Sequence, residues 1–285
     1  MEIIELTNKE LNEIESTFLE YVKMKSQELE HRCRGAARKG VQLEFVDTPS
    51  FQLHSRFLTD DDYRAVILFP RLQLMAMYQL FFQLKGRDAL ALGEDVRLVR
   101  WSMFYVAICC VLQHELAHIY RGHLYLRQFW KENWEQHILD WKTLEWDADR
   151  FVAEVLAEYW GVWKENKGKE ETGLGIQMLC GTLHGMMFWQ RRQENLCADV
   201  EREQQILVRE CAILQRMPVL YERQQEVLEY IQAYEEEFRR VFKNNGALEL
   251  PHNIFEVSSA LQELQSHWEK IKKELQPYAM MLLEE

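Results

Sequence analysis

The chain has 285 residues, of which 47% are hydrophobic, and a formal net charge of −12 at pH 7. This hydrophobic content is sufficient for a packed core, which excludes a wholly disordered protein. The negative charge argues against a nucleic-acid-binding protein, because phosphate recognition requires surplus Lys and Arg. The six cysteines include no CxxC spacing, so we expect reduced thiols instead of a disulfide framework.

The first residues and the apolar runs bear on where the protein resides. Glu2 and Glu5 stand where a secretory signal would have basic residues followed by an apolar run. Trp101 to Leu112 is too short to cross a bilayer, and Gly173 to Gln190, although uncharged, contains polar residues that favour a buried helix. We therefore expect a cytoplasmic protein without a membrane span.

The N-terminal part of the chain is predicted to combine one helix with a small sheet. Thr7 and Glu10 have the spacing of a capping box, and apolar residues at helical spacing predict a helix from about Asn8 past Leu29. Three strands are predicted over 41–45, 51–53 and 65–69, where apolar residues alternate with polar ones or form a continuous run.

Glycine and proline are sparse from Pro70 onward, and long segments of helical periodicity dominate the remaining sequence. Helices are predicted over 72–84, 95–126, 134–162, 175–193, 200–215, 219–242 and 254–275, with loops over 164–172 and 243–251. The expected fold class is therefore mainly α with a small β-sheet, an α+β arrangement. We expect a single domain over 1–285, with a C-terminal helical accessory layer over about 243–285.

The segment Gln113 to His123 reads QHELAHIYRGH and contains an HExxH pattern. Side chains four positions apart lie on one face of a helix, so His114 and His118 can bind the same metal ion. Imidazole nitrogens suit tetrahedral zinc, and Glu115 can accept a proton from a water that the metal activates. The alternative is a pair of core histidines that are satisfied by hydrogen bonds.

A tetrahedral zinc site also requires a third protein ligand and an open position. Downstream, the segment LEWDADRFVAE places Glu145 and Asp149 four residues apart on a predicted helix. We expect Glu145 to be the third ligand and Asp149 to accept a hydrogen bond from a ligand imidazole. Asp147 and Asp149 remain alternatives for the third ligand.

His123 is the last residue of the HExxH segment, but its spacing argues against a ligand role. It lies nine residues after His114, whereas the third histidine of HExxHxxGxxH lies ten residues after the first. If Gly122 breaks the helix, His123 can instead contact the substrate or support a ligand from outside the coordination sphere.

The two motifs resemble those of the gluzincin metallopeptidases, in particular the HtpX and CAAX-protease group, in which HExxH is followed by ExxAD. That group also carries an HP motif with an arginine five residues after the proline, which Pro218 and Arg223 match, although Met217 replaces the histidine. Its membrane helices have no counterpart among the predicted elements. The resemblance implies a zincin-like core and an Arg223 that faces the site. The HELAHIYRGH segment is also similar to phage-exclusion peptidases of the Lit type.

We therefore predict a zinc-dependent metalloendopeptidase that cleaves an intracellular protein, with one zinc ion per chain and Glu115 as general base. Arg223, Tyr221 or His184 is expected to stabilise the oxyanion, although His184 also fits a packed helix histidine and Tyr221 a core residue. In zincins an edge strand before the active helix holds the substrate. Ala65 to Phe69 is the candidate for this strand, with a buried structural strand as the alternative.

Two other classes of function stay open. The first is a zinc-binding scaffold that acts through partner contacts on the acidic helices around Glu235 to Glu237, although an intact Glu115 argues against it. The second is a zinc hydrolase of another bond, because HExxH activates water and does not select a substrate. The expected partners are a protein or peptide substrate and a regulatory protein, and the oligomeric state is not assigned.

Overall fold

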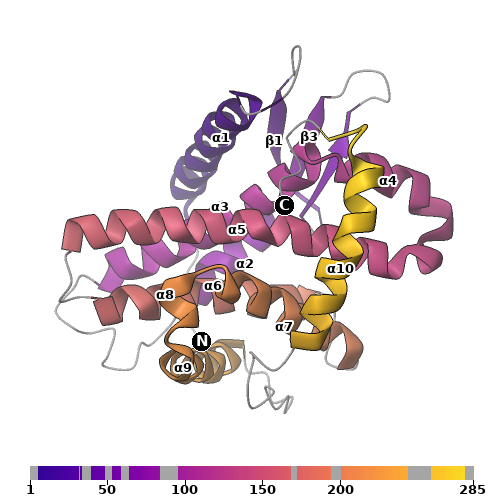
Figure 1. Cartoon of the computed structure of the whole chain (residues 1–285). Coiled ribbons are helices and arrows are strands. Elements are labelled where there is room, and N and C mark those ends of the chain that lie inside the picture. The colour runs from indigo at the N-terminus through magenta and orange to yellow at the C-terminus, as the bar shows by residue number, and fades with distance from the viewer. Residues whose placement is uncertain are drawn as a thin grey trace. The chain divides into compact units, whose positions relative to one another are not determined.

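The computed structural model describes residues 6–31, 33, 40–48, 53–58, 64–83, 96–167, 172–193, 200–242 and 258–279. These residues form mainly helices together with one three-stranded sheet, which is the fold class that the sequence predicts (Figure 1). The chain divides into two compact units. Unit 1 comprises Met1–Glu5, Leu74–Cys110 and Ala153–Ser258, and unit 2 comprises Leu6–Gln73, Val111–Val152 and Ser259–Glu285. The single domain over 1–285 stays a prediction, and its proposed layer boundary at 243 lies outside the described residues.

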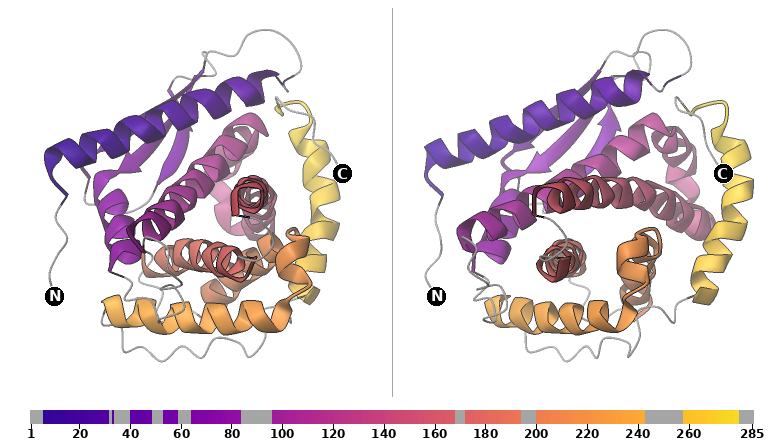
Figure 2. Two further views of the ribbon diagram at one scale, coloured as in Figure 1. Left: turned by 90° about the vertical axis from the view of Figure 1, so that its left-hand side faces the viewer. Right: turned by 60° about the vertical axis from the view of Figure 1, so that its left-hand side comes forward.

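Helix α1 (Asn8–His31) begins at the predicted capping box. The backbone nitrogen of Thr7 donates to Oε2 of Glu10 at 2.9 Å, and the backbone nitrogen of Glu10 donates to Oγ1 of Thr7 at 3.2 Å. The helix buries Phe18 and Val22, and it lies along the sheet (Figure 2). The predicted start of this helix is therefore confirmed.

The sheet consists of β1 (Val41–Val46), β2 (His54–Phe57) and β3 (Ala65–Pro70), in the order β1-β3-β2. Strand β3 pairs in parallel with β1 and antiparallel with β2, so it is the central strand. The expectation that Ala65 to Phe69 is an edge strand is therefore wrong. Its continuous apolar run has a structural cause, because Val66, Ile67 and Phe69 are fully buried.

The helices that follow the sheet carry the HExxH and ExxAD motifs. They are α2 (Arg71–Phe82), α3 (Val96–Tyr120), α4 (His123–Trp130), a 3-10 segment η2 (Lys131–His137) and α5 (Ile138–Lys167). The predicted continuous helix over 95–126 is wrong at its end, because Gly122 has a φ of +82° and separates α3 from α4. A Cβ on Gly122 would lie 2.8 Å from the carbonyl carbon of Tyr278, so no larger residue fits there without a shift.

Among the described residues, α3 is the one helix that is long and apolar enough to cross a membrane. Its most apolar 18-residue window is 61% buried inside the structure. This is weak support for a membrane span, because the core helix of a folded domain has the same length and composition.

The remaining helices are α6 (Thr172–Gln193), α7 (Val200–Gln215), α8 (Pro218–Tyr221), α9 (Gln224–Phe242) and α10 (Ser258–Leu275). Within unit 1, α6 packs against α9 (Figure 2). A Cβ on Gly181 of α6 would lie 2.4 Å from the ring of Tyr234 of α9, so this close approach requires glycine. The predicted helix over 219–242 is interrupted after Tyr221, and Met217 before it is extended. Residues 254–257 of the last predicted helix lie outside the described residues.

Candidate metal centre

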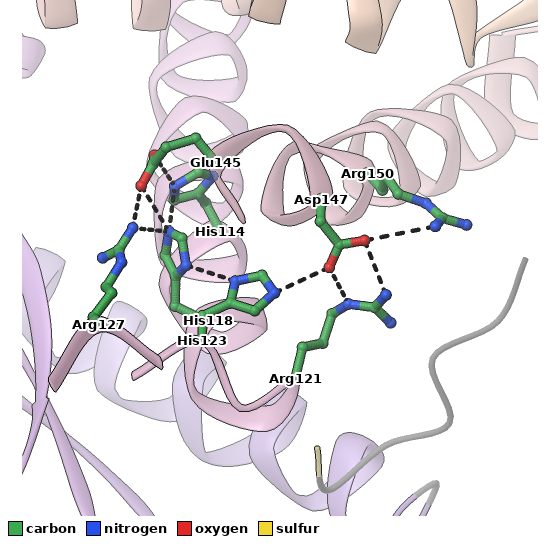
Figure 3. Close-up of polar contacts among 8 residues, drawn as sticks. All are labelled: His114, His118, Arg121, His123, Arg127, Glu145, Asp147 and Arg150. Atoms are coloured by element: carbon green, nitrogen blue, oxygen red, sulfur yellow. Dashed lines mark hydrogen bonds and ion pairs between the residues drawn. The ribbon is translucent and has the colours of Figure 1, made fainter. Parts of the chain in front are cut away.

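Helices α3 and α5 bring His114, His118 and Glu145 together in unit 2 (Figure 3). Each offers one ligand atom, and these atoms lie within 4.8 Å of one another. Nε2 of His114 lies 3.0 Å from Nε2 of His118 and 3.1 Å from Oε2 of Glu145. Nε2 of His118 lies 3.3 Å from Oε1 of Glu145. These are the three residues that the sequence predicts as ligands.

The separations fit a tetrahedral metal ion. Bonds of about 2.0–2.1 Å to nitrogen and oxygen place two ligands of a tetrahedral zinc about 3.3 Å apart. The three atoms are therefore at nearly the distances that one zinc ion requires, from 3.0 to 3.3 Å. Two histidines and one carboxylate are also a donor set that zinc accepts in sites with an open position. The residues present thus fit this metal.

The electrostatic surroundings favour ligand-competent forms of two of the three side chains. Burial lowers the pKa of His118 well below its ordinary value, and the nearby Arg127 lowers it further, so the ring is neutral. Burial raises the pKa of Glu145, but the charge of Arg127 and the hydrogen bond with His114 outweigh this effect and lower it, so the carboxylate stays ionised. A neutral imidazole and a carboxylate are the forms that bind metals.

His114 is held between two carboxylates. Its Nδ1 lies 2.9 Å from Oδ1 of Asp149, the contact that the four-residue spacing predicts, and its Nε2 faces Glu145. Burial lowers the pKa of His114, but hydrogen bonds with Asp149 and Glu145 outweigh it and raise the pKa to about 9. Asp149 is itself buried, and its contact with Nδ1 fixes the orientation of the His114 ring.

Glu115, the expected general base, is buried on α3 next to the first ligand. Its Oε2 has no hydrogen-bond partner among the described residues. Burial raises the pKa of the Glu115 carboxyl, whereas His114 and the nearby hydroxyl of Ser55 on β2 counteract the rise. A buried carboxylate oxygen without a protein partner is costly, so it indicates a place for water or a substrate.

Arg127 is a member of the cluster that the sequence analysis missed. Its Nη2 lies 3.1 Å from Nε2 of His118 and also donates to Oε1 of Glu145 (Figure 3). The guanidinium is placed over the ring of Trp141, 4.5 Å from the centroid. On a helix that continued past Leu126, Arg127 would project away from His118. The turn at Gly122 brings it back, and this glycine was the only signal for it in the sequence.

A buried chain of polar contacts extends from His118 away from the other ligands. Nδ1 of His118 lies 2.8 Å from Nδ1 of His123, and Nε2 of His123 lies 3.1 Å from Oδ2 of Asp147. Arg121 donates to both carboxylate oxygens of Asp147, and Arg150 approaches one of them at 3.5 Å. Burial lowers the pKa of His123 to about 4, so its ring is neutral. His123 thus contacts a candidate ligand, and its two roles, as support for that ligand or as a substrate contact, stay predictions.

His184 and Arg223, the other expected catalytic residues, belong to unit 1. Nδ1 of buried His184 lies 2.9 Å from Oε1 of Glu210, and its Nε2 lies 2.7 Å from Oε2 of Glu235. These contacts agree with the alternative of a packed helix histidine. Glu235 is buried, although it is the first residue of the acidic segment Glu235 to Glu237 that the scaffold alternative uses for partner contacts.

The Arg223 side chain is 44% exposed and its Nη1 lies 3.2 Å from Oε2 of Glu226. Tyr221 is also exposed, so the alternative that it is a core residue is wrong. Because the three candidate ligands belong to unit 2, the catalytic roles of His184, Arg223 and Tyr221 stay predictions. Comparison of the chain with protein-family models, curated proteins and solved structures gives no match.

Proposed function

We propose that this protein is a zinc-dependent metalloendopeptidase with a zincin-like core, in which His114, His118 and Glu145 bind one zinc ion. The observation that carries the proposal is the convergence of three ligand atoms, 3.0 to 3.3 Å apart, beside a buried Glu115. HExxH followed by ExxAD is also the donor set of the gluzincin peptidases that the sequence resembles.

The chemistry divides between the ion and the protein. Zinc at this place supplies a Lewis acid that polarises a peptide carbonyl and lowers the pKa of a water molecule. The Glu115 carboxylate takes a proton from that water and gives it to the nitrogen of the leaving amine. Burial raises the pKa of this carboxyl, and a base whose pKa is closer to neutral both accepts and returns a proton readily.

Arg127 is the candidate for the group that stabilises negative charge on the carbonyl oxygen. Such a donor has to be in place before the charge develops, in a site that is shielded from water. The guanidinium lies beside the triad, and Trp141 packs against it independently of the His118 contact that a metal would displace. This proposal assigns to Arg127 the role for which the sequence suggested Arg223, His184 or Tyr221.

Strand β2 is the candidate for the strand that binds an extended peptide. It pairs with β3 on one side and has no second strand partner among the described residues. Its Ser55 side chain lies near the carboxyl of Glu115, which is the expected general base. Main-chain hydrogen bonds to an edge strand suit a peptide and not a small molecule, which supports peptidase activity over hydrolysis of another bond.

The test uses the zinc-loaded full chain and its Glu115→Gln variant. Both are expected to hold one zinc per chain, because the substitution leaves the three ligands unchanged. After incubation with a denatured cell lysate, mass spectrometry should detect new peptide N-termini with the wild-type protein only. Loss of a general base lowers a rate by about 10²- to 10⁴-fold.

The possible results separate the three classes of function. A chain that binds no zinc at micromolar concentrations contradicts the metal centre itself. A zinc-loaded chain that yields no new termini from any protein in the lysate contradicts the peptidase assignment and leaves another hydrolase or a scaffold. A cellular effect that is identical for wild type and Glu115→Gln supports the scaffold.

A further inference from the structure

We infer that His123 and Asp147 form a positioning relay that holds His118 in the tautomer with its lone pair on Nε2. This inference deepens the proposed function and rests on it where it refers to zinc. The relay consists of two contacts, from Asp147 to His123 and from His123 to His118 (Figure 3). Arg121 at one end and Arg127 at the other determine which atom donates in each contact.

Asp147 determines which ring nitrogen of His123 carries the proton. Arg121 donates to both of its carboxylate oxygens, and the Asp147 side chain is fully buried. The Arg121 guanidinium is itself held between the rings of Phe151 and Trp268, 5.4 and 5.3 Å from their centroids. An ionised carboxylate only accepts hydrogen bonds, so the Nε2 of His123 that faces it, at 3.1 Å, carries the proton.

This proton placement determines the next contact along the relay. A neutral imidazole has one N–H, and in His123 this group is Nε2–H, so Nδ1 of His123 is an acceptor. Nδ1 of His118 lies 2.8 Å from it in a fully buried contact and must be the donor. His118 therefore carries its proton on Nδ1 and its lone pair on Nε2, the atom that faces His114 and Glu145.

A second contact leads independently to the same tautomer. Nη2 of Arg127 lies 3.1 Å from Nε2 of His118. A guanidinium has donors and no acceptor, so the nitrogen that it faces has to offer a lone pair. Both sides of the His118 ring are thus consistent with one proton arrangement, and that arrangement is the one that a metal ligand needs.

The tautomer of His118 can be measured directly in the metal-free protein. Long-range ¹H–¹⁵N correlation spectra of histidine-labelled protein distinguish Nδ1–H from Nε2–H rings, and single His→Gln variants assign the signals. The expected result for wild type is an Nδ1–H ring at His118. An Nε2–H ring at His118 in wild type overturns the inference, whether or not the protein binds zinc.

Two variants then test the relay through its effect on zinc. Asp147→Asn has one acceptor oxygen for the three donors that Arg121 and His123 direct at Asp147, so the proton on Nε2 of His123 and the tautomer of His118 are no longer enforced from this side. Zinc affinity, measured by competition with a chelator, should fall about 10- to 100-fold, the usual cost of losing a partner of a metal ligand. His123→Gln should retain wild-type affinity, because its carbonyl oxygen accepts from His118 and its amide donates to Asp147.

Two further variants separate this role from general destabilisation. His267→Gln removes a partly buried histidine–carboxylate contact at Asp140, 2.5 Å long and within the same unit, and should leave zinc affinity unchanged. His123→Leu removes the nitrogen that accepts from His118, and it should lower zinc affinity about as much as Asp147→Asn does. The inference is overturned if zinc affinity falls as much in His123→Gln as in His123→Leu. It is also overturned if Asp147→Asn lowers zinc affinity no more than the control His267→Gln. A wild-type chain that binds no zinc would refute the proposed function, while the metal-free spectrum would still decide the tautomer.

Discussion

Arg127 contacts His118 at the nitrogen that a metal ion would use, since its Nη2 lies 3.1 Å from Nε2 of the imidazole. The same guanidinium nitrogen donates to Glu145, so Arg127 is paired with the Glu145 carboxylate in the absence of a metal. A guanidinium and a zinc ion cannot both occupy the lone pair of His118. Arg127 and the metal are therefore expected to compete for this nitrogen.

Replacement of Arg127 by Gln should separate metal binding from catalysis. Removing a positive charge next to the ligands is expected to leave zinc affinity unchanged or raised, because the repulsion between the two cations disappears. Turnover should fall about 10²- to 10³-fold if the guanidinium stabilises the oxyanion. Chelator competition and the rate of peptide cleavage measure the two effects. A loss of zinc in this variant would show that Arg127 supports the ligands instead.

Replacement of Glu145 by Gln should remove the third ligand, since an amide oxygen is a poor ligand for zinc. We expect zinc affinity to fall more than the roughly 100-fold that loss of an outer partner costs. Metal analysis of the purified variant measures this loss against about one zinc per wild-type chain. The matched control is Glu132→Gln, an exposed glutamate of η2 that should keep its zinc. Equal zinc contents in the two variants would refute Glu145 as a ligand.

Replacement of Gly122 by Ala should destabilise the protein by about 2 kcal/mol or more, because a positive φ and a backbone clash act together. Its Cβ would lie 2.8 Å from the Tyr278 carbonyl carbon. Gly40→Ala is the matched control, since Gly40 has a φ of +81° but no atom within 4 Å of an added Cβ. Urea unfolding should show a clearly smaller loss at Gly40, of about 1 kcal/mol. Equal losses would mean that strain alone, without the clash, is responsible.

Asp140 should make the stability of the protein depend on pH. Burial raises its pKa, but hydrogen bonds from His137 and His267 and the charge of Lys270 outweigh this and lower the pKa below its ordinary value. A lowered pKa in the folded state stabilises the protein above the unfolded pKa of about 3.9, and this stabilisation is lost as pH falls through the folded value.

Asp140→Asn should therefore cost about 1–2 kcal/mol at pH 6, where the partly buried contacts with His137 and His267 lose a charged acceptor. The difference from wild type should shrink as pH falls below about 4, because the wild-type carboxyl becomes protonated there. Urea unfolding of both proteins between pH 6 and 3 measures this. A difference that stays constant over the range would show that the charge of Asp140 does not contribute.

The parts of the structure that follow from short-range spacing were predictable from the sequence. The capping box at Thr7 defined the start of α1, and the four-residue spacings placed His114 beside His118 and Asp149 near the first ligand. Each of these features depends on a few neighbouring residues and on helix geometry.

The parts that were missed depend on long-range pairing or on one backbone angle. The position of β3 in the centre of the sheet depends on its pairing with two other strands, which periodicity does not reveal. Arg127 was missed because apolar periodicity continues past Gly122, and the left-handed conformation there reverses the chain. The contact that requires glycine at this position comes from Tyr278, far away in the sequence.

Helix α10 makes the support of the candidate metal centre depend on the order in which the chain is synthesised. Trp268 lies over the guanidinium of Arg121, which donates to Asp147. The three candidate ligands leave the ribosome more than a hundred residues before α10 does, because the last of them is Glu145. A nascent chain can therefore present the ligands before it can orient them, and zinc captured at that stage would be held by an incomplete set of supporting contacts.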